Sequence, residues 1–278
     1  MNVEPDITVT IIFHHEGALA LSALASLGDL VSVARAGGLA VETQAILDRA
    51  DELTQHNLKE RGWWIDAVEE VSFGDLGLSR NAGARTARGR FLSFLDGDDL
   101  WGEQWLRAAF QAATAPAAPD DLIWHPEYLY VFSDAEPDGK PAAGITRMQS
   151  SDTPGFDPAM LLFGNLWSAN AFASRDLYLR FPYYAVDRNR GIGIDDWSWN
   201  LATLAAGVQH RVVPGAVHLI RRKVAGSLDR QNAAQQLLPR LPESTIRDRQ
   251  WPRAFLRRRD SSAAVAGLTV NPDIPQQL

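Results

Sequence analysis

The stretch GLSRNAGARTARGRFLSFLDGDDL, residues 77–100, decides the fold. Its first part, 78–87, has the spacing of small and apolar residues that is typical of a helix, and 90–95 forms a short apolar strand. The strand ends abruptly in the acidic group Asp96, Asp98 and Asp99. Alternation along an extended chain puts Asp96 and Asp98 on the same side, where their charges repel each other unless a cation lies nearby.

This acidic group suits a hard divalent cation. Carboxylate oxygens are preferred ligands of Mg²⁺ and Mn²⁺, whose remaining coordination positions are filled by water and by substrate phosphates. The competing interpretation is a solvated turn, because Asp-Gly-Asp is also common turn chemistry. A calcium-binding EF-hand loop fits poorly, since the expected Gly and terminal Glu are absent at the required spacing.

Strand and helix signals alternate on either side of this stretch. Further strands are predicted over residues 7–13, 39–47, 67–73 and 122–132, and a helix over 18–30. This order predicts an α/β fold with a doubly wound, mostly parallel sheet. Polar clusters follow several of the strands, and ligands bind beyond the carboxyl ends of such strands. The polar clusters are therefore expected to meet in space.

The rest of the chain divides by composition. Residues 133–155 are rich in Pro, Gly, Asp and Ser, which predicts a mobile loop or lid, and a second structured unit is predicted over 158–219. We expect one domain over residues 1–228, with a nucleotide-binding half (1–111) and an acceptor half (112–228). Residues 229–278 are expected to form a C-terminal extension, which includes an Arg-rich stretch at 247–259.

Composition limits the function. The 278 residues carry a formal net charge of −7, which disfavours nucleic acid as the main partner because phosphate contacts need a basic face. The chain has no Cys, so thiolate metal sites and disulfides are excluded. The first residues lack the basic region of a signal peptide, and polar residues interrupt the longest apolar runs. A cytoplasmic protein is the expectation, with peripheral association at the cytoplasmic face of a membrane left open.

The stretch over residues 77–100 resembles glycosyltransferase family 2, whose members have the GT-A fold. In that family a G-L-[SA]-x-A/R-N-x-G helix precedes a G-x-[YF]-[IVL]-x-[FL]-L-D-x-D-D strand end, and the matching residues here are Arg80, Asn81, Gly83, Gly89, Phe91 and the acidic group. The resemblance extends over about residues 7–228. It implies a GT-A type, mostly parallel sheet flanked by helices, with acceptor-side elements toward the C-terminal end.

The resemblance also implies a donor site at the strand ends and a basic loop near residue 221. The residues expected to bind a nucleotide sugar are Phe13, His14, Glu16, Asp48, Asp75, Arg80, Asp96, Gly97, Arg221 and Arg222. The expected ligands of a divalent metal, Mn²⁺ or Mg²⁺, are Asp98 and His218. From the residues alone, His218 fits a core histidine better than a ligand, because it lies in an apolar strand. The base expected in the donor is uridine, with guanosine and deoxythymidine as alternatives.

On the acceptor side, the run Gly193-Ile-Asp-Asp-Trp197 resembles the family's E-D-W motif. The resemblance implies that Asp196 is the catalytic base and that Asp195 stands in the Glu position. Both acids also precede a Trp-rich helix, so either one fits a helix N-cap. The other residues expected near the acceptor are Trp167, Asn170 and Trp197.

The function implied is that of an inverting glycosyltransferase. It would move a sugar from a nucleoside-diphosphate donor to a hydroxyl acceptor, with surface polysaccharide or glycan synthesis as the expected setting. A single base without a covalent intermediate implies inversion. Two alternatives are a non-catalytic nucleotide-sugar or glycan-binding protein and a nucleotidyltransferase. A nucleotidyltransferase would need a Gly-rich basic loop after the first strand. The run Phe13-His-His-Glu-Gly17 is not such a loop.

Overall fold

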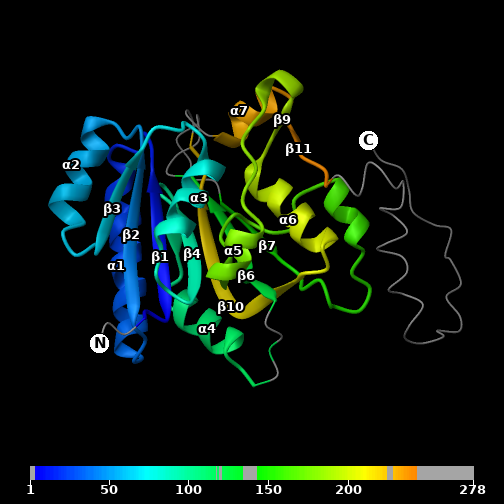
Figure 1. Cartoon of the computed structure of the whole chain (residues 1–278), viewed down its shortest axis with the longest axis horizontal. Helices are drawn as coiled ribbons and strands as arrows, with labels where there is room; N and C mark the ends of the chain where they lie inside the picture. The colour runs from blue at the N-terminus through cyan, green and yellow to red at the C-terminus, as the bar shows by residue number, and fades with distance from the viewer. Residues whose placement is uncertain (1–3, 117, 119–120, 134–142, 224–227, 243–278) are drawn as a thin grey trace, which may run out of the picture.

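The computed structural model describes residues 4–116, 118, 121–133, 143–223 and 228–242. Within these residues a nine-stranded sheet crosses the molecule in the order β3-β2-β1-β4-β8-β6-β10-β5, with β7 paired to β6 (Figure 1). This confirms the predicted α/β fold with a mostly parallel sheet. The strands are β1 (Ile7–Phe13), β2 (Val41–Asp48), β3 (Ala67–Val71), β4 (Phe91–Asp96), β5 (Leu100–Trp101), β6 (Leu122–Phe132), β7 (Ala143–Arg147), β8 (Phe172–Ser174) and β10 (Gln209–Arg221).

The helices form a layer on each face of the sheet. On one face, α1 (Leu19–Ala36) contacts both α2 (Glu52–Arg61) and α4 (Trp105–Ala113). On the other face, α3 (Leu76–Thr86) contacts α5 (Arg175–Arg180) and α6 (Asp195–Ala205). Strands β3, β2, β1 and β4 run parallel, so their carboxyl ends lie at one edge of the sheet. The shorter elements are η1 (Pro158–Leu162), η2 (Arg188–Arg190), β9 (Ile192–Gly193), α7 (Leu228–Ala234) and β11 (Leu238–Pro239).

Helix α1 is the most apolar of the described helices. By length and composition alone it could cross a membrane, and it is the one described helix with that property. In the fold its apolar side chains lie against the sheet, and Leu24, Leu27, Leu30 and Val31 are all buried in the core. It ends at residue 36 rather than near the predicted residue 30, because the apolar spacing continues through Ala34 up to the glycines that follow.

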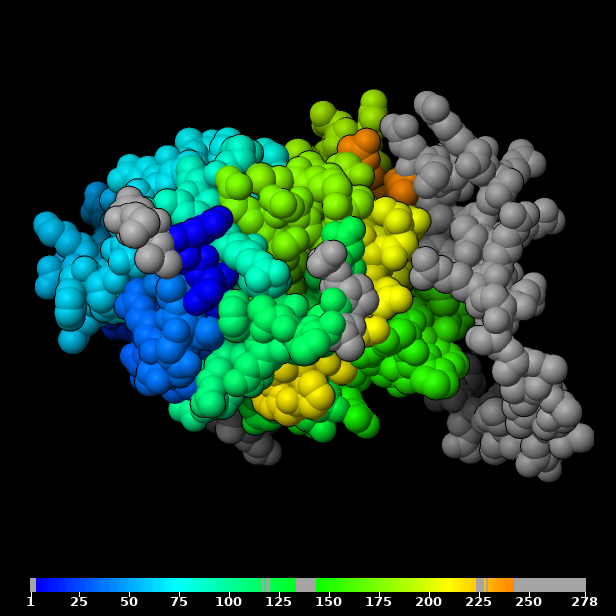
Figure 2. Space-filling view, turned by 60° about the horizontal axis from the view of Figure 1, so that its bottom comes forward, coloured from blue at the N-terminus to red at the C-terminus, as the bar shows by residue number. Residues whose placement is uncertain are grey.

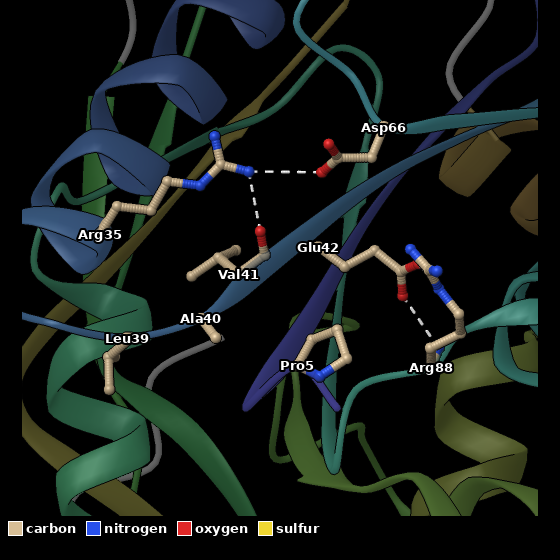
Figure 3. Close-up of a pocket in the computed structure, with 8 residues that line it drawn as sticks. All are labelled: Pro5, Arg35, Leu39, Ala40, Val41, Glu42, Asp66 and Arg88. Atoms are coloured by element: carbon tan, nitrogen blue, oxygen red, sulfur yellow. Dashed lines mark hydrogen bonds and ion pairs between the residues drawn. The ribbon is translucent and has the colours of Figure 1, made fainter. Parts of the chain in front are cut away.

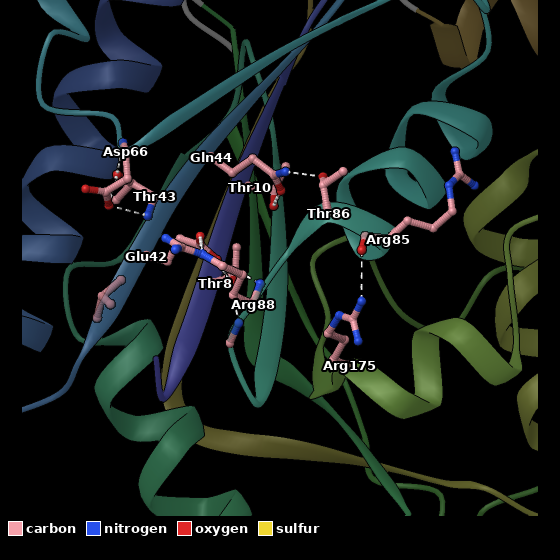
Figure 4. Close-up of polar contacts among 12 residues, drawn as sticks. Thr8, Thr10, Glu42, Thr43, Gln44, Asp66, Arg85, Thr86, Arg88 and Arg175 are labelled. Carbon is pink, nitrogen blue, oxygen red and sulfur yellow. Dashed lines mark hydrogen bonds and ion pairs between the residues drawn. The ribbon is translucent and has the colours of Figure 1, made fainter. Parts of the chain in front are cut away.

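Beneath α3 the sheet carries a row of buried polar side chains (Figure 4). Thr8 on β1 donates to Glu42 on β2 over 2.6 Å, and Thr10 donates to Gln44 over 2.9 Å. The Glu42 carboxylate also accepts from the backbone N–H of Arg88 over 2.9 Å. These bonds fasten the start of β4 to the first two strands, so the acidic end of β4 is held in register with the end of β1.

Two segments differ from the sequence-based prediction. The predicted loop at 133–155 contains strand β7, which pairs antiparallel with β6 and leaves Ile145 67% exposed. Its alternation is short and polar, so local periodicity does not mark it as a strand. The predicted C-terminal extension begins as part of the folded body, since β11 pairs with β9 and Leu237 is buried. Residues 243–278, with the Arg-rich stretch, lie outside the described residues.

Figure 2 shows the molecule from the edge where the strands begin. The deep-blue start of β1 lies there among the blue and green segments of the first half of the chain. The opposite edge, at the carboxyl ends of the strands, is where the predicted site residues gather.

Candidate functional site

A tight turn after β4 presents the acidic group. The backbone N–H of Asp99 donates to the carbonyl oxygen of Asp96 over 3.0 Å. A side chain at Gly97 would lie 2.6 Å from the carbonyl oxygen of Ile12 and would collide with the Phe13 ring, so only glycine fits this turn. Phe13 itself is fully buried and packs in the core, so its expected role in nucleotide binding stays a prediction that the burial of its side chain does not favour.

The end of β10 lies beside this turn and supplies positive charge. Lys223 Nζ pairs with Asp98 Oδ2 over 2.7 Å. The guanidinium Nε of Arg221 donates to the carbonyl oxygen of Asp98 over 3.0 Å, and its backbone N–H donates to Asp99 Oδ1 over 2.8 Å. Arg222, in contrast, has an exposed side chain. Its backbone N–H donates to the carbonyl oxygen of Phe132.

Arg80 joins the acidic turn to the acceptor half. It is 1% exposed, and it pairs with Asp96 Oδ1 over 2.7 Å through Nη2 and with Asp195 through Nη1. A buried arginine between two carboxylates is held firmly, because losing either partner would leave a charge in a low-dielectric environment. The end of β4 and the start of α6 therefore lie together, and the residues predicted for donor and acceptor binding meet here.

Asp196, the expected base, is partly buried at the first turn of α6. Its Oδ1 accepts from the backbone N–H of Trp197 over 2.8 Å, and its Oδ2 accepts from the side-chain amide of Asn165 over 2.9 Å. Ile194, the N-cap residue just before the helix, has a φ of 59°. This left-handed conformation costs energy for a β-branched side chain. Such backbone strain occurs at functional sites, where the surrounding structure holds it in place.

Four carboxyl groups of the site are hard to ionise, and burial raises the pKa of Asp195 among them. Burial raises the pKa of Asp196 to about 7, and the neighbouring charge of Asp195 acts in the same direction. Burial also raises the pKa of Glu16 to about 7, with Asp98 contributing. Burial raises the pKa of Asp99 to about 6 against the favourable contact with His218. Perturbed acids gathered in one place are typical of catalytic sites, although ion-pair networks produce them as well.

The other residues predicted for the nucleotide side hold the turn between β3 and α3. Asp48 is buried, and its carboxylate accepts from the backbone N–H groups of Gly74 and Asp75 and from the hydroxyl of Ser79. Asp75 caps α3 by accepting from the N–H of Leu78, and its second oxygen accepts from the N–H of Val186. These contacts use three of the about four acceptor sites of the Asp48 carboxylate and two of those of Asp75. Their roles in nucleotide binding stay predictions.

His14 and Glu16 follow β1 at the same edge of the sheet. The His14 ring contacts the carbonyl oxygen of Asp48, and the Glu16 carboxylate accepts from the backbone N–H of His14 over 2.5 Å. His14 is exposed and Glu16 is half-buried. Both side chains therefore lie at the edge where the parallel strands end, and a nucleotide contact there stays a prediction.

Several acceptor-side predictions fall on packed residues. Trp167 is 2% exposed and stacks on the ring of His210 with centroids 4.2 Å apart, so it has no free face for a sugar. Asn170 is also buried, and its side-chain oxygen accepts from the Ser93 hydroxyl over 3.3 Å. Trp197 is half-buried and donates from its indole to the carbonyl oxygen of Leu161 over 2.7 Å. The acceptor contacts of these residues stay predictions, and the packing of Trp167 and Asn170 does not favour them.

The acidic turn fits a divalent cation that is held mainly by one carboxylate. Asp98 is the suitable ligand, since its side chain is 16% exposed and Mg²⁺ and Mn²⁺ commonly complete their shells with water and phosphate oxygens. No group of three or more His, Asp or Glu side chains converges as a metal site within the described ranges. Both ring nitrogens of His218 are engaged, with Asp99 Oδ2 and the Ser168 hydroxyl each 3.1 Å away. Metal coordination by His218 would break one of these contacts, and it stays a prediction.

A separate hollow lies at the opposite edge of the sheet, near the starts of β1 and β2 (Figure 3). It has a volume of about 370 Å³. Its two cations are already paired, Arg35 with Asp66 over 3.3 Å and Arg88 with Glu42 over 2.5 Å. Because these charges neutralise one another and lie far along the strands from the acidic turn, we assign no ligand to this hollow.

The architecture matches solved glycosyltransferase structures. The mannosyltransferase PcManGT from Pyrobaculum calidifontis, in complex with GDP-Man and Mn²⁺, aligns with a TM-score of 0.56 and 15% identity over 92% of this chain and 70% of that one. S. aureus TarS residues 1–349, in complex with UDP-GlcNAc, aligns with a TM-score of 0.56 and 14% identity over 92% and 73% of the two chains. GalNAc-T7 with UDP, GalNAc and Mn²⁺ aligns with a TM-score of 0.53 and 14% identity.

The chain has the GT-A fold. In the alignment with a second structure of TarS 1–349, this chain spans 60% of the TarS chain. It spans 45% of the GalNAc-T7 chain. No protein-family model matches the sequence, and no curated protein sequence matches it. The comparisons therefore establish the fold, and membership of glycosyltransferase family 2 remains a resemblance.

Within the GT-A fold, two site residues were missed by the sequence-based prediction. Asn165 follows the turn after η1 and reaches Asp196, but it lies in a stretch with no motif to mark it. Asn81 belongs to the helix motif, which does not indicate the contacts of its side chain. Its side chain both donates to the carbonyl oxygen and accepts from the backbone N–H of Tyr183, each over 2.8 Å. Only the folded structure reveals these contacts, because they join segments that are far apart in the sequence.

Proposed function

We propose that this protein is an inverting glycosyltransferase that moves a sugar from a nucleoside-diphosphate donor to a hydroxyl acceptor. The observation that carries the proposal is the double pairing of Arg80 with Asp96 and Asp195. It holds the acidic turn beside the start of α6, so a donor diphosphate at Asp98 and a proton acceptor at Asp196 would serve one reaction. The solved structures with the same fold contain UDP-GlcNAc, GDP-Man or UDP.

The reaction would proceed by a single displacement. The Asp196 carboxylate accepts the proton of the acceptor hydroxyl while the hydroxyl oxygen forms a bond to the anomeric carbon of the donor. The bond between that carbon and the diphosphate oxygen breaks, and the diphosphate leaves with the electron pair. Attack from the face opposite the leaving group inverts the anomeric configuration. A base with a pKa of about 7 suits this role, because proton transfer is most efficient when the pKa lies near the working pH.

Positive charge on the donor side would stabilise the leaving diphosphate. A divalent cation held by Asp98 would supply Lewis-acid charge stabilisation when bound. Lys223 and Arg221 already lie within bonding distance of Asp98 and would add fixed positive charge next to the diphosphate. The donor proposed is a uridine diphosphate sugar, with GDP- and dTDP-sugars as alternatives. The proposed setting, glycan or surface polysaccharide synthesis in the cytoplasm or at its membrane face, rests on the family resemblance alone.

Two measurements test the proposal. The first is the thermal stability of the protein with UDP, GDP and dTDP, each with and without Mn²⁺, because a ligand that binds the native state raises the melting temperature. We expect a shift with one nucleotide that depends on the metal. No shift with any nucleotide would contradict the donor site.

The second measurement is the release of nucleoside diphosphate from UDP-glucose, UDP-N-acetylglucosamine, GDP-mannose and dTDP-glucose, with water as the acceptor. We expect the D196N variant to lose at least about a hundredfold in rate while it keeps the nucleotide-dependent thermal shift. The anomeric configuration of the released sugar, followed by NMR, should be opposite to that of the donor. Binding without turnover in the wild type would favour a nucleotide-sugar-binding protein, and retention of configuration would contradict the mechanism.

A further inference from the structure

Asn165 and Asn200 form a hydrogen-bonded chain that ends on Asp196. The side-chain amide of Asn200, on α6, donates to Asn165 Oδ1 over 2.9 Å. The amide of Asn165 in turn donates to Asp196 Oδ2, also over 2.9 Å. Asn200 is 1% exposed, so this end of the chain lies in the core.

The direction of this chain is set by the carboxylate. An ionised carboxylate only accepts hydrogen bonds, so the Asn165 side chain presents its NH₂ group to Asp196 and its oxygen to Asn200. The opposite orientation would place the amide oxygen of Asn165 against the carboxylate. Asn200 satisfies the oxygen of Asn165 in the orientation that the carboxylate requires.

Asn165 and the backbone of α6 together fix the Asp196 carboxylate. Trp197 N–H holds Oδ1 from the helix, and Asn165 holds Oδ2 from the segment after η1. Two bonds on different oxygens prevent rotation of the carboxylate plane. Each oxygen keeps a further lone pair, which is what a base needs to accept a proton from a hydroxyl.

We propose that Asn165 is a positioning residue for Asp196, which orients the carboxylate and favours its ionised form. The inference rests on the proposed function, because it assigns Asn165 to the base of that reaction.

The groups around Asp196 are mostly charged, and Asn165 is a neutral hydrogen-bond donor among them. Asp195 precedes it on α6, Asp96 faces it from β4 and Arg80 faces it from α3, while the buried phenol of Tyr183 lies near the same group. Two of these neighbours are carboxylates, and their repulsion of the Asp196 charge is only partly offset by Arg80. An amide that donates to Oδ2 stabilises the ionised form without adding another titrating group.

The first test uses the N165A variant, with N189A as the control because Asn189 is an exposed asparagine on η2. Release of nucleoside diphosphate from the four donor sugars named above, with Mn²⁺, is followed as a function of pH. We expect N165A to lower kcat by about tenfold, to leave the KM for the donor within about twofold, and to move the acidic limb of the kcat profile to higher pH. N165A with a wild-type pH profile would overturn the proposal.

The second test needs no turnover. The destabilisation caused by N165A is measured by urea unfolding at about pH 5 and about pH 8, in the wild type and in the D196N background. Because Asn165 stabilises the ionised carboxylate, we expect the loss to be larger at the higher pH in the wild type and independent of pH in D196N. An equal loss at both pH values would show that the contact is only structural.

The two tests separate this inference from the proposed function. If D196N keeps wild-type turnover, Asp196 is not the base and both the mechanism and the positioning role are wrong. If D196N is inactive while N165A behaves like N189A, the proposed base stands and only the role of Asn165 is wrong.

Discussion

Asp196 is a carboxyl group in surroundings that oppose its ionisation. Burial and the charge of Asp195 both raise its pKa, and Ile194, just before the helix that contains Asp196, has a left-handed conformation. The structure tolerates both costs because Arg80, Asn165 and the backbone of Trp197 hold the segment in place. The same features that suit Asp196 to accept a proton near neutral pH should make the native state less stable when it is charged.

Replacement of Asp196 by Asn should therefore stabilise the protein in a pH-dependent manner. The folded pKa, about 7, lies above the value for an unfolded Asp, so the native state binds the proton more tightly. The contribution of Asp196 to stability is present at low pH and is lost as pH rises through about 7. We expect the melting temperature of D196N to exceed that of the wild type by an amount that grows from about pH 5 to about pH 8.

The matched control for this measurement is D29N, because Asp29 is exposed on helix α1. Its melting temperature should follow that of the wild type across the same pH range. A difference between D196N and the wild type that does not vary with pH would mean that Asp196 ionises in the native state as readily as in the unfolded chain.

Helix α3 is the element that connects the two halves of the site. Asp75 accepts from the N–H of Val186, Arg80 pairs with Asp195, and Asn81 clasps the backbone of Tyr183. Gly77 allows this close approach, since a side chain there would lie 3.0 Å from the carbonyl oxygen of Tyr184. One face of α3 thus docks the segment that leads from residue 181 to the candidate base.

Removal of the Asn81 side chain should loosen this docking. The N81A variant leaves the N–H and the carbonyl oxygen of Tyr183 without their partners, and Tyr183 is 4% exposed. We expect a loss of about 2–3 kcal/mol in the free energy of unfolding, measured by urea denaturation. R85A, at an exposed position near the end of the same helix, should change it by less than about 0.5 kcal/mol. Equal effects of the two variants would contradict the docking role.

At the level of elements, the sequence predicted those with strong local periodicity. Strands 7–13 and 122–132 are confirmed with the predicted bounds, and the ends of the strands over 39–47 and 90–95 differ by one or two residues. Strand β7 was missed because it is short and pairs at one side only with β6. Helix α2 was not predicted because its residues, ELTQHNLKER, are mostly polar and only three of them are buried.

The candidate site was predictable where one motif carries it and not where distant segments meet. The acidic turn follows directly from the residues after β4, and its neighbours in α3 belong to the same stretch of sequence. The partners of those residues are set by packing. Nothing local to Asp98 indicates Lys223, and nothing local to Asp196 indicates Asn165. Trp167 and Asn170, in turn, were placed near the acceptor by sequence position, while burial directs them into the core.

For the whole molecule, the main consequence of the fold is that the two predicted halves, 1–111 and 112–228, share one sheet. Strand β8, from the acceptor half, pairs with both β4 and β6, so the ladder continues across the predicted boundary near residue 111. The hydrophobic cluster under α1 also includes residues of both halves, such as Leu24 and Phe172. Neither half can therefore unfold without exposing the core of the other.

The halves should unfold together. Urea denaturation followed by far-UV circular dichroism and by tryptophan fluorescence is expected to give superimposable curves with one midpoint. Fluorescence is informative here because tryptophans lie in both halves, for example Trp105 and Trp199, which are both buried. Two separated transitions, or different midpoints for the two signals, would mean that the halves are independent domains.

The contacts that join α3 to Tyr183 and Asp195 also bear on the order in which the candidate site forms while the chain is being synthesised. Asn81 and Tyr183 are 102 positions apart, and Arg80 and Asp195 are 115 apart. A ribosome delivers the acidic turn long before it delivers the candidate base, and the N-terminal part of a chain generally folds first. Contacts across such separations close late. A half-synthesised chain could thus build β1 to β4 with the acidic turn, yet it would lack the candidate base Asp196 until translation had passed the start of α6.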